Sequence, residues 1–187
     1  MESLLVSTLV VAIAEIGDKT QLLALCLAAT WRKPVPIILG ILIATVANHL
    51  LAGAVGAVAG HFLQGWWMKW VLGLGFLAFA AWALIPDKFD DCPPDSRKTD
   101  WQVLVATTIA FFLVEMGDKT QVATAALAAR FQDLVPVVMG TTLGMLIANV
   151  PAVLIGEAAA TKLPLKHIRW AAAACFAAVG VWILAVG

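Results

Sequence analysis

The chain has 187 residues, of which 62% are hydrophobic and only 13% are charged. A soluble domain of this size needs more polar residues to cover its surface, so the composition excludes a soluble globular protein. The formal net charge is zero at pH 7, which gives no basic surface suited to nucleic acid. We therefore expect an all-α integral membrane protein with little chain outside the bilayer for a catalytic domain.

Six apolar segments follow one another along the chain, and each is close to the roughly 20 residues that a helix needs to span a bilayer. The first lacks a basic region before it, so we expect a retained helix rather than a signal peptide. A polar linker with a Pro-Pro pair, 87–101, divides the chain into a first half, 1–86, and a second half, 102–187. The predicted spans are 3–28, 34–60, 66–86, 102–128, 134–158 and 167–186.

The two halves of the sequence align at an offset of about 100 residues. The heptapeptide that starts at Glu15 (EIGDKTQ) returns at Glu115 as EMGDKTQ. Further pairs at this offset are Pro36 and Pro136, Gly40 and Gly140, and Trp70 and Trp170. Each half holds three predicted spans, and an odd number of spans gives the halves opposite orientations. The sequence therefore predicts an inverted repeat of two three-helix units, with a substrate site near the bilayer midplane.

The orientation in the membrane is predicted from the basic residues of the loops. Eight lie in the loops after spans one, three and five, whereas only Lys69 and Arg130 lie on the other side. Positive loops stay in the cytoplasm, so the linker is expected there and both termini on the outer side of the membrane. Whether the protein is a monomer or a homodimer does not follow from the sequence.

Each heptapeptide places ionisable residues at membrane depth, which marks a candidate functional site. In a continuous helix Glu15 and Asp18 share one face, and so do Glu115 and Asp118. Oxygen ligands without Cys or His suit hard cations such as Mn²⁺, Ca²⁺ or Mg²⁺. We predict metal ligation by these four carboxylates, with amide oxygens from four further side chains: Gln21, Gln121, Asn48 and Asn149.

The other motif residues have several possible roles. Thr20 and Thr120 are candidate hydroxyl ligands. Lys19 and Lys119 either offset the excess negative charge of the carboxylates or reach towards an interface as structural residues. Crowded carboxylates repel one another, so we hypothesise that protons and the metal ion compete for the same oxygens. The metal is then a transported substrate, and no cofactor is expected.

The sequence assigns no definite role to His49, to the motif glycines or to the cysteines. His49 has Val150 as its counterpart in the second half, so we do not expect it to be essential. The glycines before the two aspartates either break the helices to line a cavity or simply let helices pack closely. The three cysteines, Cys26, Cys92 and Cys175, are scattered and odd in number, so neither a disulfide framework nor a zinc site is predicted.

The paired E-x-G-D-K-T motifs, one in the first helix of each half, resemble those of a known family. It is the MneA-type bacterial manganese exporters, related to the Golgi-type Mn²⁺/Ca²⁺–proton exchangers, and the resemblance covers essentially the whole chain. It implies cation/proton antiport, with Mn²⁺ favoured and Ca²⁺ possible. It also implies metal-ligand roles for Glu15, Asp18, Glu115 and Asp118.

Other functions are less well supported by the sequence. Two intramembrane Gly-Asp pairs are found in aspartyl proteases of the membrane, but hydrolysis requires neither the glutamates and lysines nor a symmetric fold, so we expect no enzyme. A passive divalent-cation channel is the main alternative, although deep carboxylates favour tight occupancy. A purely structural role would bury two acid–lysine clusters at considerable cost.

Overall fold

The computed structural model describes residues 1–62, 65–85, 98–155 and 165–186, with side chains in the last segment from 170 to 185. Every regular element in these residues is a helix, which confirms the predicted all-α class. The helices are α1 (Glu2–Glu15), α2 (Lys19–Trp31), α3 (Pro34–Phe62), α4 (Met68–Ala83), α5 (Asp100–Glu115), α6 (Lys119–Phe131), α7 (Leu134–Ile155) and α9 (Leu165–Val186).

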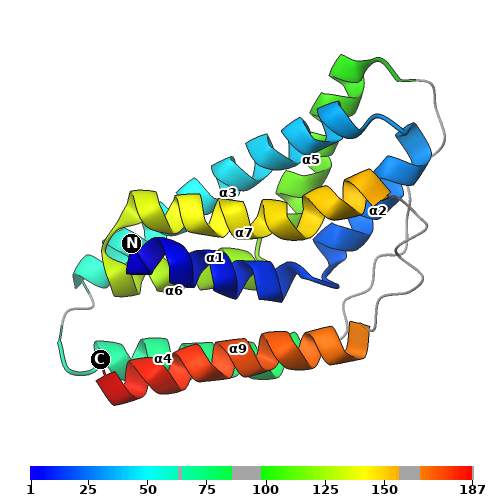
Figure 1. Cartoon of the computed structure of the whole chain (residues 1–187). Helices are drawn as coiled ribbons and strands as arrows, with labels where there is room; N and C mark the ends of the chain where they lie inside the picture. Colours follow the sequence, from blue (N-terminus) through cyan, green and yellow to red (C-terminus); the bar gives the residue numbers. More distant parts are fainter. Residues whose placement is uncertain (63–64, 86–97, 156–164, 187) are drawn as a thin grey trace.

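Helix α1 begins at the end of the molecule where α9 finishes (Figure 1). The first and fourth predicted spans are each divided into two helices, α1 with α2 and α5 with α6. By length and composition α3 and α7 could each cross a membrane. The pair α5 and α6, bent by 71° at its break, could count as a third span.

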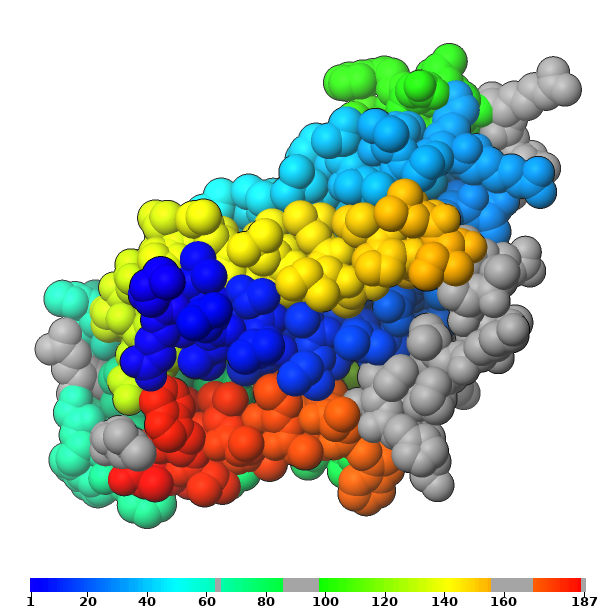
Figure 2. Space-filling model, viewed as in Figure 1, coloured from blue at the N-terminus to red at the C-terminus, as the bar shows by residue number. Residues whose placement is uncertain are grey.

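The helices of the two halves pack crosswise. The first helix of each half, α1 or α5, lies along the long helix of the other half, α7 or α3. Helices α4 and α9 pair with each other beside this core, and α1 lies between α7 and α9 on the face seen in Figure 2. The first helices of the two halves are therefore held by the opposite half, where their broken ends can meet.

Two glycines at repeat-related positions permit this close packing. A Cβ atom at Gly40 would lie 2.7 Å from the Cβ atom of Thr107 on α5. A Cβ atom at Gly140 would lie 2.5 Å from the carbonyl oxygen of Leu4 on α1. Both separations are too short for a nonbonded contact of a Cβ atom. Glycine therefore lets α3 approach α5 and lets α7 approach α1.

The cysteines differ from the sequence prediction at one position. Cys26 is disulfide-bonded, although no disulfide was expected. The prediction was wrong because proximity in the fold, which sequence spacing does not reveal, decides whether thiols can join. Cys175 is a free thiol. Cys92 and most of the linker 87–101 lie outside the described residues.

Candidate metal site

The two motifs form matching breaks between short helices. Helix α1 ends at Glu15 and α2 begins at Lys19, while Gly17 between them has a φ of 81°. In the second half Gly117 has a φ of 78°. This left-handed backbone is available to glycine at little cost, which explains why glycine precedes each aspartate. The expectation of continuous helices with carboxylates three residues apart on one face is therefore wrong, because the backbone turns at each glycine.

The breaks bring three carboxylates from the two halves together. Glu15, Asp18 and Asp118 each offer an oxygen, and these oxygens lie within 4.8 Å of one another. All three residues are buried, with exposed fractions of 0%, 5% and 2%. Asp18 and Asp118 stand at the N-terminal ends of α2 and α6, where the helix dipoles favour negative charge. The cluster therefore offers a concentrated set of hard oxygen ligands.

The motif lysines cross between the halves. Lys119 Nζ lies 3.4 Å from Asp18 Oδ1, and Lys19 Nζ lies 3.3 Å from Asp118 Oδ1. Each lysine thus pairs with the aspartate of the other motif rather than with its own neighbour. Lys119 is 6% exposed at its side chain, whereas Lys19 is 25% exposed. The two ion pairs link the motifs and offset part of the negative charge.

Glu115 has different neighbours from its counterpart Glu15. Its Oε1 atom lies 2.9 Å from His49 Nε2 on α3, and its Oε2 atom accepts a 3.3 Å hydrogen bond from Asn48 Nδ2. His49 Nδ1 in turn lies 3.5 Å from the hydroxyl of Thr142 on α7. Glu115, Asn48 and His49 are all fully buried. These contacts hold Glu115 outside the group of three carboxylates.

A glutamine side chain forms a hydrogen bond to the glycine at each helix break. Gln21 Oε1 accepts a 2.7 Å hydrogen bond from the Gly17 amide, and Gln121 Oε1 accepts a 2.6 Å bond from the Gly117 amide. The Gln21 amide group also donates to the Ala148 carbonyl at 2.9 Å. The two glutamine oxygens predicted as metal ligands therefore accept hydrogen bonds from the backbone in this structure.

The asparagines and threonines predicted for the site have different partners in the two halves. Asn48 joins α3 to α5 and accepts a 3.4 Å hydrogen bond from Gln121. Asn149 instead donates to Met145 on its own helix, at 3.0 Å from the carbonyl oxygen. The Thr20 hydroxyl donates to Glu15 Oε2, and Thr120 is buried at the start of α6. The structure thus gathers Thr20 and Asn48 around the glutamates, while the Asn149 Oδ1 atom is buried without a hydrogen-bond partner.

Sequence reasoning missed one residue of this site, His49. Its absence from the second half argued against a role, yet its ring is in direct contact with a motif glutamate. The available signal was its position next to Asn48, since a histidine at membrane depth is rare and polar groups there need partners.

The space beside the cluster is small. A cavity of about 10 Å³ is lined by residues of both motifs, including Gly17, Asp18 and Lys119, together with Phe176 of α9. This volume leaves room for at most one water molecule. The three carboxylates are therefore buried beside a space that is smaller than a hydrated ion.

The broken apolar helices and the buried carboxylates define a class of protein, a membrane transporter of cations. Residues 3–91 and 103–187 match the family described as "Divalent cation/proton antiporter GDT1". The chain belongs to this family, which points to a non-enzymatic transporter. It is 51% identical over 177 residues to a protein of Vibrio cholerae serotype O1 (strain ATCC 39541 / Classical Ogawa 395 / O395) described as "Putative manganese exporter". The alignment covers 94% of this chain and 87% of that protein. No solved structure matches the chain.

Proposed function

We propose that the protein exports Mn²⁺ in exchange for protons, with Glu15, Asp18 and Asp118 as the core ligands of the transported ion. The observation that carries this proposal is the meeting of three buried carboxylates, drawn from both halves, within 4.8 Å of one another. Carboxylate oxygens suit Mn²⁺ and also Ca²⁺. The 51% identical relative described as a manganese exporter supports Mn²⁺ as the preferred substrate.

The crossed lysines give the exchange a simple electrostatic basis. Without a divalent ion, Lys19 and Lys119 offset part of the charge on Asp118 and Asp18. An arriving ion binds the same carboxylates and replaces the lysines and any bound protons as the source of positive charge. A proton and the metal therefore compete for the same oxygens, so loading one releases the other.

The amide side chains act in this proposal by holding the site in shape. Gln21 and Gln121 each tie a glycine of the break to the following helix. Asn48 fixes Glu115 and Gln121, and through them the end of α5. Direct ligation by either glutamine would require it to release the glycine amide, so we propose positioning roles rather than metal ligation for these side chains.

The proposed transport cycle is alternating access between two inverted halves in a bacterial inner membrane. The crosswise packing of α1 on α7 and of α5 on α3 supports the inverted repeat. The enclosed carboxylates favour a moving barrier over an open channel, because a channel needs a continuous wet path. The placement of both termini on the outer side rests on the basic residues of the loops.

A proteoliposome experiment tests this function. Purified protein is reconstituted with a pH-sensitive dye inside, and Mn²⁺, Ca²⁺ or Mg²⁺ is added outside while metal uptake and internal pH are recorded. We expect metal entry coupled to proton exit, fastest with Mn²⁺ and abolished in Asp118→Asn. Asp100→Asn is the matched control, since Asp100 is exposed and pairs with Lys33 far from the motifs. Metal entry that follows only the membrane potential, without proton flux, would show a channel instead.

A further inference from the structure

A pocket at the end of the molecule where α1 begins carries a charge pattern that the transport site does not use. It has a volume of about 450 Å³ and lies between α4, α6 and α9. Its lining includes Lys69 of α4 and Arg130 of α6, which are the two basic residues that the sequence assigns to this side of the membrane. Both of these isolated cations therefore line the same pocket.

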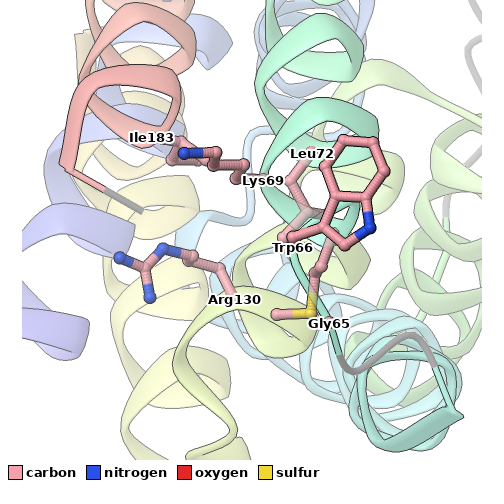
Figure 3. A pocket seen from close by; sticks show the side chains of 7 residues that line it. Gly65, Trp66, Lys69, Leu72, Arg130 and Ile183 are labelled. Atoms are coloured by element: carbon pink, nitrogen blue, oxygen red, sulfur yellow. The ribbon is translucent and has the colours of Figure 1, made fainter.

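The two cations extend in the same direction (Figure 3) and are not engaged in ion pairs among the described residues. Figure 3 shows the side chains of Lys69 and Arg130 extending in the same direction, towards α9. In the described part of the chain neither residue forms an ion pair, and the Arg130 Nε atom is buried without a hydrogen-bond partner. The Arg130 guanidinium also lies 5.5 Å from the ring centre of Trp182, which fixes its position. A lysine and a fixed arginine that form no ion pair can together bind an anion.

The rest of the pocket is suited to a lipid rather than to a small free anion. Leu72 and Ile183 are buried and form an apolar floor next to the charges. Trp66 is 79% exposed at the rim, as expected for a side chain at the membrane interface. Met68, half-buried, adds a further apolar side chain to the lining. An inorganic phosphate would satisfy the cations but leave Met68 and Trp66 uncovered.

We propose that this pocket binds the headgroup of an anionic phospholipid, with its phosphate between Lys69 and Arg130. Arginine and lysine both bind phosphate, arginine through its planar fork of donors and lysine as a point charge. The glycerol and upper acyl chain would lie against Met68 and Trp66. A lipid bound there would connect α4, α6 and α9, and α6 begins at Lys119 in the candidate metal site.

Native mass spectrometry of the full chain tests this proposal independently of transport. Protein is released from phosphatidylcholine nanodiscs that contain a minor fraction of phosphatidylglycerol, and retained phosphatidylglycerol is counted. We expect the Lys69→Gln/Arg130→Gln variant to retain about tenfold less than the unchanged protein, since each basic residue near an anionic surface adds to the attraction. Arg130→Lys keeps the charge and should retain most of the lipid.

The control variant removes the same charge elsewhere. Arg32→Gln/Lys98→Gln lowers the net charge equally, at residues that do not line the pocket. Equal lipid loss in this control would overturn the proposal, because nonspecific attraction would then explain the retention. Unchanged retention in Lys69→Gln/Arg130→Gln would also overturn it. Displacement of the lipid from the unchanged protein by inorganic phosphate alone, at near-physiological concentration, would assign the pocket to a free anion instead.

Discussion

The two halves of the molecule carry the same motif but use its glutamate differently. Glu15 lies in the carboxylate cluster and accepts a hydrogen bond from Thr20 of its own motif. Glu115 contacts His49 and Asn48 of the other half and stays outside the cluster. The halves differ at two repeat-related positions, because the counterpart of His49 is Val150 and the counterpart of Asn48, Asn149, bonds Met145 instead of a motif glutamate. A duplicated motif can therefore form a single asymmetric site rather than two equal ones.

Substituting the motif lysines should lower the folding stability more than any other change, and the loss should be greater at Lys119 than at Lys19. Lys119→Met breaks a buried ion pair with Asp18, which typically costs about 3–5 kcal/mol of folding free energy. Lys19→Met should cost less, because Lys19 is 25% exposed and water can replace it. Thermal unfolding in detergent measures both, and added Mn²⁺ should restore part of the loss. Equal losses in the two variants would show that burial does not distinguish the pairs.

Neutralising the two glutamates should separate their roles. Glu15→Gln removes a member of the cluster, so we expect Mn²⁺ binding to weaken by about a hundredfold. Glu115→Gln changes a neighbouring group and should weaken binding by about tenfold. Isothermal titration of the purified variants with Mn²⁺ compares them directly. A stronger effect of Glu115→Gln than of Glu15→Gln would contradict the asymmetric site.

Substituting the two repeat-related glycines of α3 and α7 should lower the stability of the protein by similar amounts. Gly40→Ala and Gly140→Ala each place a Cβ atom less than 3.0 Å from the facing helix. Overpacking of this kind costs about 1–3 kcal/mol, and the two losses should be similar. Gly75→Ala is the control, because a Cβ atom at Gly75 meets nothing within 4 Å. Unfolding temperatures of the three variants check this, and a loss in Gly75→Ala equal to the others would remove the steric explanation.

Making the second half resemble the first should have the smallest effect. His49→Val removes the contact that holds Glu115, which can then join the cluster as a fourth carboxylate. We expect Mn²⁺ to bind about threefold more tightly, in line with a typical polar contact between membrane helices, and the maximal transport rate to fall. His49→Gln keeps a hydrogen-bonding group and should restore both values. If KM and the maximal rate stay unchanged in His49→Val, the histidine does not position Glu115.

The sequence predicts the helices and the motif residues well but not their contacts. Apolar length locates the long helices α3 and α7, and repetition identifies the glutamates, aspartates and lysines as one group. The break at Gly17 depends on a backbone angle that residue spacing does not encode. The crossing of Lys119 to Asp18 and the contact of His49 with Glu115 join residues from different halves, so they depend on how the helices pack.

The number of Mn²⁺ ions bound per chain tests the central claim, that both motifs contribute to a single site. Equilibrium dialysis of the purified protein against Mn²⁺ gives this number, and Asp18→Asn and Asp118→Asn show which motif is needed. We expect one ion per chain, lost in either variant. Two ions per chain, with one remaining after either substitution, would contradict the account, since each motif would then bind its own ion.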